Sequence, residues 1–210
     1  MICDSMLKKI FLELCNRHTS NIVLAEDFWN EIENAYSQPK RFYHNLEHLE
    51  YLIDSLQPII DEIKDWDTLM FSVFYHDIVY KPVNKDNEEQ SAFLAVKRLE
   101  ELGVNDGVIS ECRQQILATK SHQVSGNPDV NFFTDADLAI LGSDWESYHS
   151  YMNKIRKEYK VYPDIIYKPG RRKVVQHFLA MERIYKTDYF FVRLEQQAKE
   201  NLTKELTLLS

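Results

Sequence analysis

The chain has 210 residues, which is enough for one compact domain with a sizeable hydrophobic core. Hydrophobic residues make up 44% and charged residues 28%, as in an ordinary globular protein, and glycine and proline are scarce at five and six copies, which favours helices over sheets. The net charge of −8 disfavours a nucleic-acid partner, which needs a basic face, but allows a small anionic substrate beside a bound cation.

Hydrophobic spacing predicts helices along the whole chain, without repeats, low-complexity tracts or linkers. We therefore expect an all-α fold, a compact single-domain helical bundle over residues 1–210. The expected helices, in chain order, are 7–17, 26–36, 44–58, 66–79, 87–102, 108–122, a short helix within 132–142, 144–159, 171–185 and one from 188 onward.

Several features of this pattern carry structural expectations. The helix over 66–79 is apolar nearly all the way round, which is typical of a buried helix. Gly103 and Gly142 are expected to stop helices, Pro82 to end the helix over 66–79, and Pro169 to precede the helix that begins at Arg171. The last helix carries an apolar stripe, which predicts that it packs on the core; its members are Phe191, Leu194, Ala198, Leu202 and Leu206.

The cysteines and the first residues indicate the compartment. Cys3, Cys15 and Cys112 are odd in number and form no CxxC pair, which predicts a reduced, cytoplasmic protein with free thiols. Four charged residues interrupt the run 1–14, so we expect neither a signal peptide nor a membrane span, and no membrane partner.

Two sites put histidine among apolar residues. His44 and His48 are four apart and would share one helix face if the helix already includes His44; alternatively, they simply pack at a helix start. His76-Asp77 is expected in the middle of the buried helix, where an ionised carboxylate is costly unless it binds a metal or pairs with an arginine.

Two further sites are weaker signals by themselves. Asp135 and Asp137 lie in an apolar stretch, but Thr134 followed by Asp137 is also a capping-box pattern at a helix start. His122 lies at the end of an expected helix and alone would be an ordinary core or surface histidine. Together, two histidines and two aspartates from three helices form a donor set that suits a divalent ion such as Mn, Fe, Co, Zn or Mg. An open position on that ion could activate water for hydrolysis.

The ordered phrases RFYHNLEH, FYHDIVYK, NEEQSA and TDADLAILG, spread over about residues 41–172, resemble the HD superfamily of metal-dependent phosphohydrolases. Within it they look like a bacterial group of predicted HD phosphohydrolases. The resemblance implies that the metal ligands are His48, His76, Asp77 and Asp137. It further implies that Asp135 orients a ligand or water, and that His44 could protonate a leaving oxygen, as the matching histidine does in cyclic-nucleotide phosphodiesterases.

Departures from better-known HD branches narrow the activity. Residues 78–81 lack the acidic pair typical of guanosine tetraphosphate hydrolases. The chain also lacks the HD-x-GK turn and the later His-His pair of cyclic-di-nucleotide enzymes. Both activities are therefore disfavoured.

Proton transfer and phosphate binding need further groups. Glu88 or Glu89 could act as a base or organise water, although acidic residues also suit the first turn of a helix. Cationic groups near the motifs are candidates for binding substrate phosphate: Lys120, Arg41, Arg156 and Arg171. His122 is a further candidate, because it lies two residues after Lys120.

The leading hypothesis is hydrolysis of a phosphate ester or anhydride of a nucleotide or similar small metabolite, with a small phosphorylated substrate as the only expected partner. One alternative is a di-iron oxygenase of the HD type, in which His122, His149 or His177 adds iron ligands. Another is a catalytically silent nucleotide-binding module. The oxygenase would hold two irons and consume oxygen, and the module would be stabilised by ligand without turnover.

Overall fold

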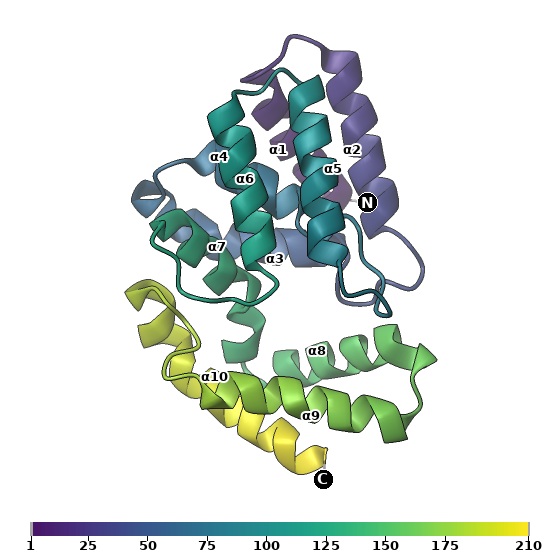
Figure 1. Ribbon diagram of the computed structural model, residues 1–210, viewed down its shortest axis with the longest axis vertical. Coiled ribbons are helices and arrows are strands. Elements are labelled where there is room, and N and C mark those ends of the chain that lie inside the picture. The colour runs from purple at the N-terminus through teal and green to yellow at the C-terminus, as the bar shows by residue number, and fades with distance from the viewer. Residues whose placement is uncertain (1, 210) are drawn as a thin grey trace. The chain divides into compact units, whose positions relative to one another are not determined.

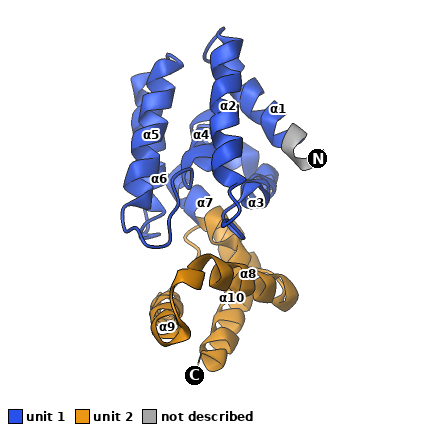
Figure 2. Cartoon of the chain, turned by 90° about the vertical axis from the view of Figure 1, so that its right-hand side faces the viewer, with its two compact units in different colours: residues 1–134 blue, residues 135–210 orange. Residues whose placement is uncertain are grey.

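The computed structural model describes residues 2–209, with side chains from residue 6 onward, so the side chain of Cys3 lies outside the described part. Over these residues the protein is all-helical, as the sequence predicts (Figure 1). None of the described helices is both long enough and apolar enough to cross a membrane. The chain divides into two compact units, residues 1–134 and 135–210 (Figure 2), and the boundary falls inside one continuous helix, α7 (Pro128–Asp137).

The first unit is built around one buried helix. Helix α4 (Trp66–Tyr75) contacts four others, and every residue from Thr68 to Tyr75 is buried, which confirms the buried helix inferred from its all-round apolar sequence. The surrounding elements are α1 (Ile2–Asn16), α2 (Ile22–Tyr36), α3 (Leu46–Leu56), the 3-10 helix η1 (Gln57–Glu62), α5 (Asn87–Glu101), α6 (Asp106–Ala118) and the start of α7.

Local side-chain caps fix where two of these helices begin. Asn45 caps α3 by accepting a hydrogen bond from the backbone N–H of Glu47, and Asp65 caps α4 by accepting from the backbone N–H of Thr68. Asp129, near the start of α7, accepts from the backbone N–H groups of Lys64 and Asp65. The Asn45 cap sets the end of α3 that carries His48, whereas the Asp65 cap lies at the end of α4 opposite to His76.

The second unit packs its helices around a short 3-10 turn. It contains η2 (Ala139–Gly142), α8 (Trp145–Glu158), η3 (Tyr159–Val161), α9 (Asp164–Ala180) and α10 (Asp188–Leu208). Both α8 and α10 pack on η2, and α9 packs on α10. A Cβ atom built on Gly142 would lie 2.5 Å from the Cβ of Leu194, so only glycine allows α10 to approach this turn so closely.

Around the histidines, one predicted position is wrong and one open alternative is decided by the structure. Helix α4 ends at Tyr75, so the His76-Asp77 doublet lies at its C-terminal end and not in its middle. Helix α3 begins at Leu46, after its cap Asn45, so His44 precedes the helix and the two histidines do not share a helix face. Asn45 therefore starts α3 one residue after His44, and α4 ends at Tyr75 although the apolar pattern continues to Val79.

Other helix ends also differ from the sequence pattern. Helix α9 begins at Asp164 and includes Pro169, although we expected the helix to begin only at Arg171. The proline removes the hydrogen bond to the carbonyl of Ile165, an 82% exposed residue where water can reach that oxygen. Thr134 is near the end of α7, not at its start, and its hydroxyl donates to the carbonyl of Val130, so the capping-box interpretation is wrong.

The last helix confirms its predicted stripe only in part. Ala198 and Leu202 are buried in α10 as expected, but Glu195, Asn201 and Glu205 are buried on it too. Each has a specific polar partner; Asn201, for example, donates to the carbonyl of Leu141 in η2. The helix therefore packs through buried hydrogen bonds as well as apolar contacts.

Candidate metal centre

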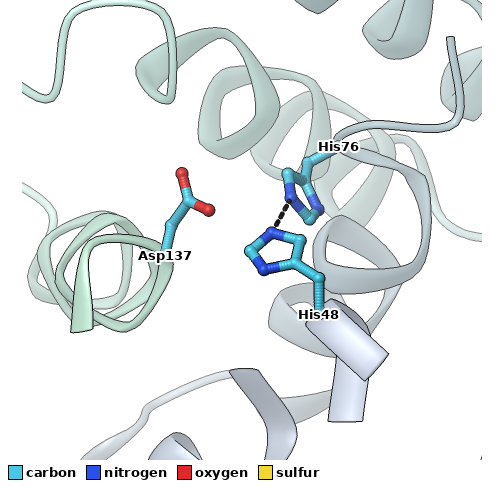
Figure 3. Close-up of side chains that lie close together, drawn as sticks. All are labelled: His48, His76 and Asp137. Carbon is cyan, nitrogen blue, oxygen red and sulfur yellow. Dashed lines mark hydrogen bonds between the residues drawn. The ribbon is translucent and has the colours of Figure 1, made fainter. Parts of the chain in front are cut away.

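Two buried histidines from different helices meet in the first unit. His48 lies on α3 and His76 caps the C-terminus of α4, and their side chains are 1% exposed. Their Nε2 atoms are 3.2 Å apart (Figure 3). Two imidazole nitrogens at this distance either share one proton or direct both lone pairs at a common cation.

The tautomer of His76 favours metal binding. Its Nδ1 lies 2.9 Å from the backbone carbonyl of Val73, which can only accept, so Nδ1 carries the proton. In the neutral ring, Nε2 is then the unprotonated nitrogen that faces His48. A hydrogen bond from the far nitrogen to a carbonyl is the usual arrangement of a metal-binding histidine.

Asp77 adds an oxygen to this pair. Its Oδ2 lies 3.2 Å from Nε2 of His76 and 4.0 Å from Nε2 of His48, and its side chain is 16% exposed. Ligands about 2.1 Å from one ion lie roughly 3.0 Å apart at a right angle and up to about 4.2 Å apart when opposite. The three distances therefore match a shared coordination sphere.

Asp137 reaches the two histidines from helix α7, in a group of three that does not include Asp77. The ring of Phe133 on this helix meets the ring of His76 edge to face at 5.7 Å. Asp137 is the last residue of α7, four positions after Phe133, and so projects from the same face. His48, His76 and Asp137 each offer a ligand atom, and these atoms lie within 4.8 Å of one another, so the group could hold a metal ion (Figure 3).

The position of Asp137 on its helix also favours a ligand role. Carboxylates are disfavoured at a helix C-terminus, where the backbone carbonyls carry partial negative charge. Asp137 occupies the last position of α7 and is only half-buried. A carboxylate held there gains from a nearby cation.

His44 lies next to Asp77 although it is outside α3. Its Nε2 is 3.9 Å from Oδ2 of Asp77, and its ring stacks on Tyr80 at 4.1 Å between centroids. The His44 side chain is 18% exposed, so it is more accessible to a small molecule than His48.

Arg41 holds the two histidine segments together. Its guanidinium donates to the backbone carbonyls of His44, Asp77 and Ile78, the last two at 2.6 and 2.8 Å. It also lies over the ring of Tyr36, whose hydroxyl accepts from the backbone N–H of Asp77. The arginine predicted as a phosphate ligand is thus 7% exposed and is engaged with backbone carbonyls.

The NEEQSA segment supports the chain that follows the doublet, a role the sequence analysis missed. The Ser91 hydroxyl accepts from the N–H of Val79 and contacts its carbonyl, and Asn87 makes the equivalent pair of bonds with Lys81. Both contacts cross from α5 to a segment without regular structure. Glu88, between them in sequence, is half-buried in the first turn of α5.

Lys120 and His122 follow α6. The Lys120 ammonium donates to Glu89 and to the carbonyl of Lys85; this hydrogen bond lowers the pKa of Glu89 and raises that of Lys120. His122 is half-buried and has a φ of 52°, a backbone conformation uncommon for a residue other than glycine. Lys120 therefore ties the end of α6 to the start of α5.

Asp135 holds a loop in the second unit. It is fully buried and accepts hydrogen bonds from the backbone N–H of Lys186 and from the N–H and hydroxyl of Thr187. The Lys186 ammonium lies 3.3 Å from Oδ1 of Asp135, and its side chain is 3% exposed. Burial lowers the pKa of Lys186, and the carboxylates of Asp135 and Asp137 oppose this shift.

The other predicted cations and histidines of the second unit are engaged locally or exposed. Arg156 pairs with Asp164, and Arg171 makes a buried two-bond ion pair with Glu205. His149 and His177 are exposed, on α8 and α9.

Comparisons with protein-family models, curated proteins and solved structures found no match to this chain.

Proposed function

We propose that this protein is a metal-dependent phosphohydrolase in which His48, His76, Asp77 and Asp137 hold a divalent ion. The observation that carries the proposal is the convergence of two imidazole nitrogens and a carboxylate oxygen, 3.2 to 4.0 Å apart, at the meeting of α3 and α4. The substrate class is a phosphate ester or anhydride of a nucleotide or similar small metabolite.

The donor set supports a divalent ion with spare coordination positions. Imidazole nitrogen together with carboxylate oxygen suits Mn, Fe, Co and Zn, and the carboxylates also suit Mg. Such an ion, when bound, activates water near neutral pH and polarises a phosphoryl oxygen. The buried histidines His48 and His76 hold their nitrogens in place without rearrangement.

The chain's own residues supply orientation and proton transfer. Arg41 fixes the backbone of both histidine segments and so keeps Asp77 aimed at His76. In this proposal a protonated His44 gives its proton to the leaving oxygen, because it is the most accessible group beside Asp77. Glu88 is the second candidate for proton transfer.

The first test is the metal content of the purified protein and of the Asp77→Asn variant. We expect about one or two transition-metal ions per native chain, and loss of both metal and hydrolysis of phosphate esters in the variant. Asp54→Asn is the matched control, because Asp54 is exposed on α3, and it should keep both. Full metal content and full turnover in Asp77→Asn would refute the assignment.

The same measurements separate the alternatives. Two irons per chain with oxygen consumption would favour the oxygenase. Thermal stabilisation by nucleotides with no turnover would favour the binding module. The buried free thiols of Cys15 and Cys112 support the proposed cytoplasmic location.

A further inference from the structure

Tyr80 follows the His76-Asp77 doublet and packs its ring against His44. The two rings stack, with 4.1 Å between their centroids and 28° between their planes. Such a contact restrains the plane of each ring, because tilting either ring would weaken the contact. The orientation of the His44 imidazole beside Asp77 therefore depends on where the Tyr80 ring lies.

Helix α5 fixes the backbone on both sides of Tyr80. Before it, the Ser91 hydroxyl accepts from the N–H of Val79 and contacts the carbonyl of the same residue. After it, the Asn87 side chain accepts from the N–H of Lys81 and donates to its carbonyl. The segment around Tyr80 lies between α4 and α5 without regular structure. These two pairs of contacts therefore set the position from which the Tyr80 ring meets His44.

Arg41 contacts both members of the stack. Its guanidinium lies over the Tyr80 ring, 5.6 Å from the centroid, and donates to the backbone carbonyl of His44. Arg41 thus anchors the backbone of His44, whereas Tyr80 contacts its imidazole. Because His44 precedes α3, the helix does not hold its backbone, and contacts of these two kinds contribute to the direction of its side chain.

The contact between His44 and Asp77 does not by itself orient the imidazole. Nε2 of His44 lies 3.9 Å from Oδ2 of Asp77, which is longer than a hydrogen bond. Attraction at that distance depends little on the angle of the ring, whereas a ring stack restrains its plane. Proton transfer requires the donor N–H to point at its acceptor within hydrogen-bond reach. The stack on Tyr80 supplies an angular restraint that such a transfer requires.

We propose that Tyr80, placed by Asn87 and Ser91, is a positioning residue that orients the His44 imidazole for proton transfer to the leaving oxygen of the substrate. The inference rests on the proposed function, because it requires hydrolysis of a phosphate ester. In that reaction the oxygen of water bonds to phosphorus, the bond from phosphorus to the leaving oxygen breaks, and the proton on His44 passes to the leaving oxygen. A proton from the attacking water then restores His44. All of these residues lie in the first unit.

The test compares the hydrolysis of two phosphate esters by the full chain with Mn²⁺ present. Phenyl phosphate has a basic leaving oxygen that needs a proton as it departs, whereas para-nitrophenyl phosphate has a weakly basic one that departs without it. In Tyr80→Leu we expect kcat for phenyl phosphate to fall by about tenfold or more, which is part of the usual contribution of general acid catalysis. For the nitrophenyl ester we expect a change of less than about twofold, with KM unchanged for both esters.

Two other variants separate the ring from its surroundings. Tyr80→Phe keeps the ring that stacks on His44 and should restore the hydrolysis of phenyl phosphate. Phe93→Leu removes a 72% exposed ring from α5 and is the matched control, which should change neither rate.

A second readout does not depend on turnover. Protons above the face of an aromatic ring give NMR signals shifted upfield by the ring current. The signals of the His44 ring, assigned by their loss in His44→Gln, should therefore move downfield in Tyr80→Leu and stay in place in Tyr80→Phe. Signals that do not move in Tyr80→Leu would show that the stack is absent and would overturn the inference.

The outcomes separate this inference from the proposed function. Equal losses for the two esters in Tyr80→Leu would mean that Tyr80 only maintains the fold, and would overturn the inference while leaving the proposed function intact, as would unchanged rates. A native chain that hydrolyses neither ester would overturn both. If Tyr80→Leu does not fold, Asn87→Ala removes a partly exposed contact and leaves the ring in the chain. It should slow phenyl phosphate more than the nitrophenyl ester, and an equal effect on both would overturn the inference.

Discussion

Replacing Arg41 with methionine separates an anchoring role from the phosphate-binding role that its sequence position suggests. The substitution keeps much of the apolar stem and removes hydrogen bonds to three backbone carbonyls, those of His44, Asp77 and Ile78. Hydrogen bonds to a charged group contribute about 1.5–3 kcal/mol each, which sets an upper bound of roughly 9 kcal/mol. Relaxation of the loop and entry of water reduce this, and we expect a loss of about 3–5 kcal/mol, as for breaking other buried charged contacts.

The assay is urea unfolding followed by circular dichroism, with a thermal scan alongside. A loss of this size corresponds to a melting temperature lower by roughly 6–20 °C for a chain of this length. Arg41→Lys should recover only part of the loss, because an ammonium cannot reproduce the planar fork that reaches carbonyls of two segments. Arg113→Met, at an exposed position of α6, is the control and should change stability by no more than about 0.5 kcal/mol.

The opposite result would refute this reasoning. Suppose that the free energy of unfolding of Arg41→Met is within about 1 kcal/mol of that of the native chain, but that the variant loses affinity for phosphate. The arginine is then a substrate ligand. The hydrogen bonds to the three carbonyls would then have no role in positioning the histidines.

Two further predictions concern packing and pH. Gly142→Ala should destabilise the protein by about 1–3 kcal/mol, because the new Cβ would meet Leu194, whereas Gly126→Ala, which meets nothing within 4 Å, should be close to neutral in urea unfolding. Burial raises the pKa of Cys15 and of Cys112 from an ordinary value of 9.0 to about 12, so the folded chain keeps protons that the unfolded chain releases. The contribution of these thiols to stability is therefore complete below pH 9 and falls as the pH rises towards 12, by about 1.4 kcal/mol per thiol at pH 10. A Cys15→Ala/Cys112→Ala variant should unfold with a flatter pH profile, and an unchanged profile would contradict the raised pKa values.

The sequence predicted the elements whose causes are local. The buried helix α4 was recognisable because apolar residues occupy all of its faces, which no exposed helix can sustain. Gly103 was predicted to end α5 and has a φ of 73°, the left-handed conformation that glycine adopts most readily. Both signals are contained in a few neighbouring residues.

The sequence could not predict features that depend on distant partners. Pro169 was expected to lie before the helix that begins at Arg171, yet α9 includes it. Whether the missing hydrogen bond matters depends on whether the opposite carbonyl is exposed, which the sequence does not state. The contacts of Arg41 and Ser91 reach segments 36 and 12 positions away. Buried carboxylates such as Asp135 look in sequence like any acidic residue at a helix end.

The wrong placement of His76-Asp77 explains how the candidate site forms. Successive residues of an α-helix point about 100° apart, so neighbouring side chains within a helix diverge. Nε2 of His76 and Oδ2 of Asp77 nevertheless lie 3.2 Å apart. This convergence becomes possible because α4 ends at Tyr75 and the chain at Asp77 is held outside the helix by Arg41. The termination of α4 is therefore as much a part of the candidate site as the side chains of His76 and Asp77.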